Sequence, residues 1–344
     1  MVISDMNLIR TEKINCPRCS SASSEIMYKG KDYLHGIPGE YYASKCLGCG
    51  LWFQNPRPIN DDIELLYPSE YAPHKEIQPQ VSHLEISSSR KEYLRTKFHY
   101  RHLRETSYHA TDWKSFRIFD FWRAHQFGIE LAPEFVEDGA LLEIGCASGG
   151  RLMTLRTMGW HHLYGVELVP EAANRAKAEG FAVECGQIEH VIENYPDSYF
   201  DVIISSMVIE HLLNPFEIFK KIAKKLKPGG QFLFSTVVRD SLDAKIYGVY
   251  WGGFDFPRHM VYFKKKEILD ALNKEFERIR YYHQNAPIDF VRSSTWLNNS
   301  GGGNILNSCV LNIAKSRYSK AIGLCLAFFK LTTRVSFSCK KKFD

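Results

Sequence analysis

Four cysteines near the N-terminus have the spacing of a metal site. Cys16 and Cys19 form one C-x2-C pair, and Cys46 and Cys49 form a second. Each pair can make a tight turn that points two thiolates at one ion, and two such pairs complete a tetrahedron. We therefore predict a structural zinc ion bound by all four thiolates, with no coordination position left open for catalysis. The alternative is a redox pair or a set of reduced free thiols.

A glycine-rich turn in the middle of the chain marks a candidate ligand site. The short apolar run at residues 141–144 leads into this turn at residues 145–150, and a helix is expected to follow. Gly145 lets the backbone approach a ligand closely, and Gly149 lets the helix pack near the strand. Because ligands bind beyond the carboxyl ends of the strands in open α/β sheets, we expect a binding site at this turn.

An acidic residue ends the next expected strand. Glu167 closes the segment at residues 162–167, where its carboxylate can accept hydrogen bonds from both hydroxyls of a ribose. A nicotinamide-binding protein shares this feature, but its turn usually reads G-x-G-x-x-G to hold a pyrophosphate. Here Ala147 stands in place of the second glycine, which favours a nucleoside ligand without a pyrophosphate.

The elements that must position these residues alternate between strand and helix. Such alternation predicts βαβ units and an α/β fold with a mostly parallel, doubly wound sheet. The expected strands lie at residues 141–144, 162–167, 181–185, 200–206, 231–237, 277–283 and 333–339, and the expected helices between them at 150–158, 170–179, 215–226 and 264–273.

Five segments in this region resemble, in order, the motifs of class I S-adenosylmethionine-dependent methyltransferases. Residues 141–149 resemble the first motif, D/E-x-G-x-G-x-G, with Ala147 at the middle glycine, and residues 164–167 resemble the second. Residues 186–189 resemble the segment that contacts the adenine, with Gln187 in place of the usual Asp. The remaining likenesses are residues 200–211 to the fourth motif and residues 226–234 to the helix–turn–strand after it. The resemblance covers roughly residues 140–237 and implies a Rossmann-like, seven-stranded fold.

The resemblance also implies which residues bind S-adenosylmethionine. Glu143 and Gly145 would lie near the methionine part, and Glu167 would bind the ribose. Gln187 and Ile188 would flank the adenine. The full set of expected cofactor-binding residues is Glu143, Gly145, Cys146, Gly149, Glu167, Leu168, Gln187, Ile188 and Met207.

Two histidines are candidate catalytic residues. The sulfonium is already a strong methyl donor, so the enzyme must align the acceptor and, for a hydroxyl, remove a proton. His211 follows the expected strand at residues 200–206, beside the methyl-donor position, and its side chain suits a general base. The alternative is that Glu210 and His211 cap the following helix or bind the cofactor.

The second candidate, His259, ends a segment at residues 251–259. This segment resembles a D-x-P-R-H stretch of methyltransferases from bacterial surface-polysaccharide loci. His259 could act as the base, and Arg258 could bind an anionic group such as a nucleotide-sugar phosphate. The alternative is a loop that packs on the sheet.

Three regions are expected along the chain. They are a zinc-ribbon-like module at residues 1–58, a linker and helical segment at 59–132, and a methyltransferase domain at 133–344 with a cap or insert at 286–331. Neither a signal-peptide-like start nor an apolar run of about 18 residues is present, so a cytoplasmic location is expected. The segment after residue 315 is strongly basic, and the apolar residues 321–329 within it could rest on an anionic membrane at its inner face. The alternative for these residues is an ordinary core helix.

These observations predict an enzyme that transfers a methyl group from S-adenosylmethionine. The resemblance implies as acceptor a sugar hydroxyl of a nucleotide sugar or surface-polysaccharide precursor. One alternative is a ribosomal RNA methyltransferase, because some such enzymes join a zinc module to this fold. The basic residues of the module barely outnumber its acidic ones, which disfavours nucleic acid as a partner. A non-catalytic scaffold with a degenerate methyltransferase fold is the other alternative.

Overall fold

The computed structural model describes residues 9–68, 88–103, 131–302, 308, 312 and 318–343. The helical stretch expected at residues 90–132 begins as α1 (Ser88–Phe98), and its remainder after residue 103 lies outside the described residues. Among the residues that the structure describes, no helix is long and apolar enough to cross a membrane.

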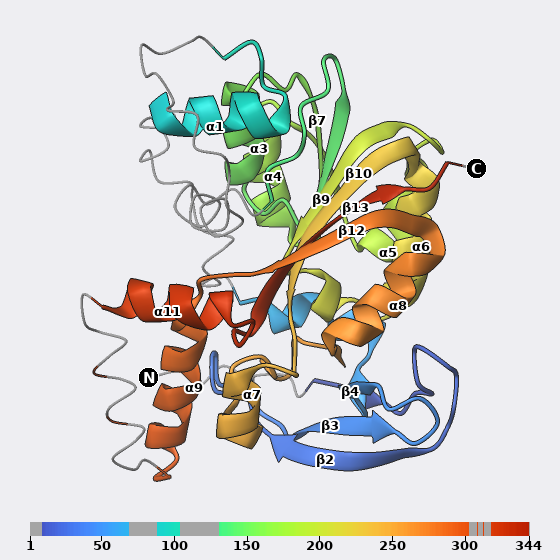
Figure 1. Cartoon of the computed structure of the whole chain (residues 1–344). Helices are drawn as coiled ribbons and strands as arrows, with labels where there is room; N and C mark the ends of the chain where they lie inside the picture. The colour runs from blue at the N-terminus through green and yellow to red at the C-terminus, as the bar shows by residue number, and fades with distance from the viewer. Residues whose placement is uncertain are drawn as a thin grey trace.

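A seven-stranded sheet forms the larger part of the molecule (Figure 1). Its strand order is β12-β13-β10-β9-β6-β7-β8, and five neighbouring strands are parallel, whereas β13 is antiparallel to both β10 and β12. The strands are β6 (Ala140–Ile144), β7 (His162–Glu167), β8 (Ala182–Cys185), β9 (Phe200–Ser206), β10 (Leu226–Val237), β12 (Phe276–His283) and β13 (Arg334–Lys341). The expected Rossmann-like sheet is therefore confirmed.

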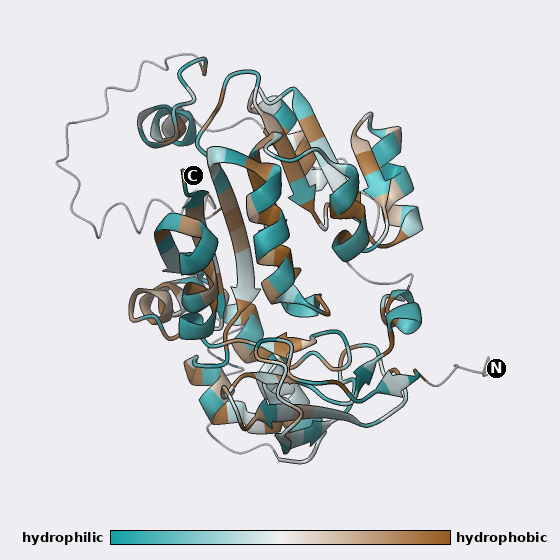
Figure 2. Cartoon of the chain, turned by 90° about the vertical axis from the view of Figure 1, so that its right-hand side faces the viewer, coloured by the Kyte–Doolittle hydropathy of each residue, from teal (hydrophilic) through white to brown (hydrophobic). Residues whose placement is uncertain are grey.

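Helices cover both faces of this sheet. Successive residues of a strand point to opposite faces, and apolar residues on both faces pack against these helices. Leu142, Ile203 and Phe232 belong to one apolar cluster with α5, α6 and α8, while Val202 and Leu233 belong to a second with α1, α3 and α4. Figure 2 shows hydrophobic and hydrophilic residues on different sides of such helices. The helices are α3 (Gly150–Thr157), α4 (Pro170–Ala178), α5 (Ile188–Val191), α6 (Pro215–Lys225) and α8 (Lys265–Glu275), with short 3-10 turns η5 (Ile192–Asn194) and η6 (Ile209–His211).

A second, four-stranded sheet contains the N-terminal region and lies below the first in Figure 1. Its order is β11-β4-β3-β2, and β11 comes from the segment between β10 and α8 rather than from the N-terminal region. The expected boundary at residue 58 therefore separates strands that share one sheet. The strands are β2 (Ser24–Gly30), β3 (Tyr41–Cys46), β4 (Trp52–Gln54) and β11 (Val261–Tyr262), and β1 (Thr11–Glu12) pairs separately with β5 (Arg57–Pro58).

An aromatic cluster joins the small sheet to the carboxyl end of β10. Tyr41 of β3 and Tyr262 of β11 are buried there with Trp251, Phe254 and Phe256, and with Val237 at the end of β10. The rings of Phe254 and Phe256 stack with centroids 5.2 Å apart. The segments around this cluster include α7 (Leu242–Tyr247), η7 (Gly248–Tyr250) and α9 (Pro287–Asn299).

The segment expected as a cap, residues 286–331, lies between β12 and β13. It begins with α9 and ends with α11 (Ser319–Phe328), which packs against α9. Leu324 and Ala327 of α11 are buried, whereas Ile322 and Phe328 are exposed, so this helix is only partly a core helix. Contact of its exposed side with a membrane stays a prediction.

Candidate active site

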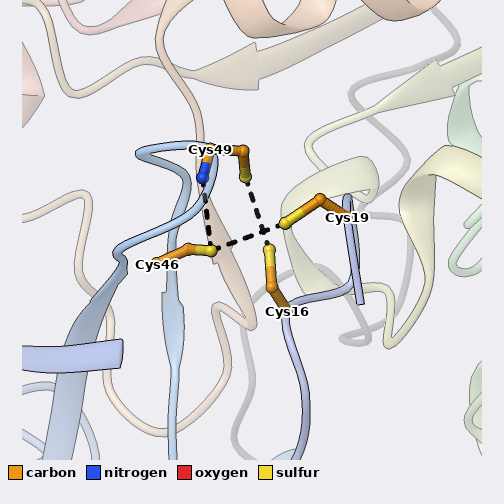
Figure 3. A group of neighbouring side chains, drawn as sticks. All are labelled: Cys16, Cys19, Cys46 and Cys49. Atoms are coloured by element: carbon orange, nitrogen blue, oxygen red, sulfur yellow. Dashed lines mark hydrogen bonds between the residues drawn. The ribbon is translucent and has the colours of Figure 1, made fainter. Parts of the chain in front are cut away.

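The four cysteines expected to bind metal lie together at one end of the small sheet (Figure 3). The Sγ atoms of Cys16 and Cys49 are 3.6 Å apart, and those of Cys19 and Cys46 are 3.5 Å apart. Zinc–sulfur bonds of about 2.3 Å place the thiolates of a tetrahedral site roughly 3.8 Å from one another. The four thiols therefore match the dimensions of a tetrahedral metal site, and none of them forms a disulfide.

A pocket opens where β6, β7 and β9 end, with about 930 Å³ of space that is partly open to solvent. This is the place expected for a ligand in an open α/β sheet. Ser206 and Val208 line it from the β9 side and Ile144 from β6. Of the residues expected to bind the cofactor, the pocket lining contains Gly145, Glu167, Leu168, Gln187, Ile188 and Met207.

Glu167 holds the turn around this pocket in place. Its Oε2 accepts a hydrogen bond from the Ala147 amide at 2.8 Å, and its Oε1 accepts one from the Val169 amide at 3.0 Å. Gly145 has a φ of 72°, a conformation that favours glycine. Glu167 also lies in the pocket lining, where a carboxylate can accept hydrogen bonds from a ligand.

Three of the expected cofactor residues lie behind the pocket rather than in its lining. Glu143 is buried and pairs with Arg151, with Oε1 and Nε 3.0 Å apart, and burial raises the pKa of Glu143 to about 7. Cys146 is buried among the side chains of the second apolar cluster. A Cβ added at Gly149 would lie only 3.2 Å from the ring of Phe181, so this glycine permits close packing of the turn.

The pocket also contains residues from the segment expected to be a linker. Ile63 and Tyr67 line it, and they follow the 3-10 turns η1 (Asn60–Asp62) and η2 (Glu64–Leu66) respectively. Gln187, expected at the adenine, donates through Nε2 to the carbonyl of Asn60 at 3.3 Å. The pocket is therefore built from both parts of the chain, and no motif in the sequence marks Ile63 or Tyr67.

The two candidate catalytic histidines meet at one end of the pocket. His211 lies in the lining, and its Nδ1 is 3.0 Å from the hydroxyl of Tyr67. The ring of His259 lies at 89° to that of His211, with centroids 4.5 Å apart. His259 is buried outside the lining, with Nδ1 2.8 Å from the carbonyl of Gly253. The fold thus pairs histidines from two distant segments.

Glu210 is a third polar group at this end of the pocket. It is fully buried, and its Oε2 accepts a hydrogen bond from Thr236 Oγ1 at 2.7 Å, while its Oε1 has no hydrogen-bond partner among the described residues. Burial raises the pKa of Glu210 and lowers the pKa of His211 well below its usual value. The imidazole of His211 is consequently neutral at physiological pH. The sequence alone indicates for Glu210 only the role of a helix cap or a cofactor ligand.

Arg258, expected to bind an anionic substrate, has a different role in the structure. Its guanidinium is fully buried and donates to both oxygens of Asp32, at 2.9 and 2.8 Å, and to Asp255 at 2.8 Å. Burial acts to raise the pKa of both carboxyls, but the guanidinium outweighs it and holds each pKa below its usual value. Arg258 therefore has no surface for an anionic substrate, and it joins the small-sheet region at Asp32 to the segment at residues 251–259 instead.

Comparisons with known proteins agree with this architecture. Residues 116–276 match a family described as a methyltransferase domain. The chain is 26% identical over 204 residues to phosphoethanolamine N-methyltransferase 1 of Arabidopsis thaliana, covering 51% of the chain and 42% of that protein. It is 32% identical over 106 residues to the ubiquinone biosynthesis O-methyltransferase of Idiomarina loihiensis, covering 29% and 43%. The chain thus spans less than half the length of these relatives.

Among solved structures, an S-adenosylmethionine-dependent methyltransferase from Archaeoglobus fulgidus is similar, with 16% sequence identity and a TM-score of 0.43. The match covers 66% of this chain and 96% of that one. The strand order 3-2-1-4-5-7-6, counted within the large sheet, and the family match over residues 116–276 rest on independent observations. Together they identify in this chain a class I S-adenosylmethionine-dependent methyltransferase domain.

Proposed function

We propose that the protein methylates a hydroxyl oxygen of a sugar, in a nucleotide sugar or polysaccharide precursor, using S-adenosylmethionine. The observation that carries this proposal is the polar end of the pocket, where Tyr67 and His211 meet beside the turn that ends β6. A hydroxyl must lose its proton to become a methyl acceptor, and neutral imidazole promotes such a loss. The resemblance of residues 251–259 to enzymes of polysaccharide loci supports a sugar as the acceptor.

For the cofactor, we assign the ribose to Glu167 and the adenine to Gln187 and Ile188. Glu167 lines the pocket at the end of β7, where a carboxylate suits the two hydroxyls of a ribose. Gly145 leaves room for the methionine part at the end of β6. The bound sulfonium supplies the methyl group, so the protein has to orient the acceptor and exclude competing water.

The two histidines promote loss of the acceptor's proton in this proposal. His211 is the nearer of the two to the acceptor, because it lines the pocket whereas His259 lies behind it. The four cysteines lie outside the pocket lining, whereas Tyr67, from the segment that follows the small sheet, lies within it. In this proposal the cysteines affect the reaction only by stabilising the part of the chain that precedes Tyr67. We assign them a structural zinc ion, since a closed set of four thiolates suits this metal.

The structure gives no support to the alternative of an RNA substrate. Of the module's basic side chains, Lys29 pairs with Glu40, Lys45 with Glu25 and Arg18 with Asp270. Lys31 lies over the ring of Tyr33. A phosphate backbone would have to compete with these partners.

The test is calorimetric titration of the purified protein with S-adenosylhomocysteine. We expect micromolar binding by the wild type and a loss of at least 100-fold in affinity in Glu167→Ala. Glu171→Ala is the control, because Glu171 is exposed in the first turn of α4. If the folded wild type does not bind, the enzymatic proposal fails and the scaffold alternative replaces it.

The acceptor is then sought with radiolabelled S-adenosylmethionine. Nucleotide sugars, undecaprenyl-linked glycans, phosphoethanolamine and ribosomal RNA are offered in parallel. Label in a sugar supports the proposal, whereas label only in phosphoethanolamine or RNA contradicts the acceptor that we assign.

A further inference from the structure

Three metal-ligating side chains meet beside the cofactor pocket, and none of them belongs to the cysteine site. We propose that Glu210, His211 and His259 bind a divalent transition-metal ion. One donor atom of each residue lies within 4.8 Å of a donor atom of the other two. In sites with bonds of about 2.1 Å the donors are roughly 3–3.5 Å apart, so side-chain movements of about an ångström would close the site.

In each of the two histidines, one ring nitrogen contacts a neighbouring residue, and the other ring nitrogen remains to bind an ion. The Nδ1 atom of His259 is bonded to the Gly253 carbonyl at 2.8 Å, which leaves Nε2 as the acceptor nitrogen. The hydroxyl of Tyr67 contacts Nδ1 of His211 at 3.0 Å. Metal-binding histidines are commonly oriented by such outer hydrogen bonds.

Glu210 has the carboxylate oxygen that is best placed to bind a cation. Thr236 bonds Oε2, but Oε1 is buried with no hydrogen-bond partner in the described structure. An unsatisfied buried polar group is costly, and more so when it is charged. A cation between Oε1 and the two imidazoles would remove that cost.

The other carboxylate near His259 is already occupied. Asp255 Oδ2 lies 3.8 Å from Nε2 of His259, but both oxygens of Asp255 accept hydrogen bonds from Arg258. Asp255 therefore has its own cation in Arg258, whereas within the part of the chain that the structure describes Glu210 forms no ion pair. This contrast favours Glu210 as the carboxylate ligand.

The donor set indicates the class of metal. Two imidazoles and one carboxylate suit Zn²⁺, Fe²⁺, Co²⁺ or Mn²⁺, whereas Mg²⁺ and Ca²⁺ prefer oxygen ligands alone. Three protein ligands also leave coordination positions open, unlike the closed set of four cysteines. His211 lines the pocket, so an open position would face the acceptor.

This site gives the histidines a specific way to activate the acceptor, a role that rests on the proposed function. The acceptor hydroxyl would coordinate the ion, which lowers its pKa, and the O–H proton would leave to water at the pocket mouth. The oxygen then bonds to the methyl carbon while the carbon–sulfur bond breaks. The electron pair of the carbon–sulfur bond stays on sulfur. His211 serves in this reaction as a ligand rather than as the base.

The test is a titration of the full chain, loaded with one equivalent of zinc per chain for the four cysteines, with Co²⁺ alone, followed by metal analysis and absorption spectroscopy. We expect one further metal per chain, with weak visible bands and without the intense near-ultraviolet bands of cobalt thiolates. In Glu210→Gln and His259→Asn this second binding should weaken at least tenfold. His162→Asn, which removes an exposed histidine, is the matched control and should bind as the wild type.

A single metal per chain in the wild type would overturn the proposal, as would second-site binding that persists in both variants. Circular dichroism and titration with S-adenosylhomocysteine are run on the same samples. Variants that keep cofactor binding but lose the second metal support the site. A wild type that binds S-adenosylhomocysteine without a second metal refutes the metal site alone, and His211 then acts directly as the base.

Discussion

The two sheets of the molecule are stabilised in different ways. The seven-stranded sheet has an apolar cluster on each face, and one of these clusters also contains Cys46, Leu51 and Phe53 from the small-sheet region. The four-stranded sheet has a cysteine cluster at one end, an aromatic cluster shared with residues 237–262, and the buried Arg258 with its two carboxylates. A unit of this size rarely folds on an apolar core alone. The difference indicates that the small sheet relies on its four-cysteine cluster and on contacts with the larger domain.

Loss of the cysteine site should give the largest effect. In Cys46→Ser the small sheet should unfold, because structural zinc contributes on the order of 10 kcal/mol to the folding of small zinc modules. Hydrogen exchange should show lost protection at residues 24–54 and retained protection in β6 and β9. Since Ile63 and Tyr67 line the pocket, affinity for S-adenosylhomocysteine should fall at least tenfold.

Cys185→Ser is the control for that change, because Cys185 is exposed and lies outside the cysteine cluster. Unchanged exchange in the small sheet of Cys46→Ser would show that its contacts with the large sheet suffice without metal.

Removal of the buried guanidinium should come next in size. Arg258→Met leaves Asp32 and Asp255 buried without their cation, which should cost about 3–5 kcal/mol of unfolding free energy. Urea denaturation measures this loss, and adding Asp32→Asn to the variant should recover part of it. Arg18→Met breaks a partly exposed pair with Asp270 and should cost about 1 kcal/mol or less. Equal losses in the two single variants would contradict the role assigned to Arg258.

The large sheet also contains a buried carboxyl, that of Glu143. Its contribution to the unfolding free energy should depend on pH. Glu143 has a folded pKa of about 7, raised by burial and only partly offset by Arg151, against an unfolded value of about 4.5. Between these two values the folded state holds a proton that the unfolded state releases. Stability from this group is therefore complete below about pH 4.5 and lost as the pH rises through 7.

We expect the unfolding free energy of the wild type, relative to Glu143→Gln, to fall by on the order of 1–3 kcal/mol across this window. Denaturant titrations of both proteins at four or five pH values measure the difference. A flat difference between pH 4.5 and 7 would show that Arg151 keeps Glu143 ionised throughout.

The smallest loss of stability should come from the removal of a single methylene group in the large sheet. Ile203→Val in β9 should cost about 0.5–1.5 kcal/mol, because it opens a small cavity in a buried cluster. Metal content and exchange in the small sheet should stay as in the wild type. A change in either would show that the loss at Ile203 reaches the small sheet through the apolar cluster that Ile203 shares with Phe53.

The large sheet and the pocket wall were predictable because their signals are local. Short apolar strands alternate with amphipathic helices, and Gly145 and Glu167 stand where strands end, so their neighbours in sequence define their surroundings. The cysteine pairs were predictable for the same reason, since each pair is a local turn.

The rest of the site depends on contacts between distant segments. Tyr67 reaches His211, and β11 reaches β4, across stretches of chain whose composition gives no sign of the pairing. Arg258 shows a second limit, because an arginine that binds a phosphate and one that bridges two buried carboxylates have the same sequence signature. Only burial separates the two roles, and burial is a property of the fold.

The position of β11 has a consequence for how this protein can be cut and recombined. A fragment that stops before residue 132 would leave β4 with an unpaired edge and the aromatic cluster uncovered, and such edges promote aggregation. A fragment that starts there would lose Ile63 and Tyr67 from its pocket. The cysteine region is therefore not a domain that can be exchanged by itself. In evolution it should be gained, lost or altered together with residues 251–263.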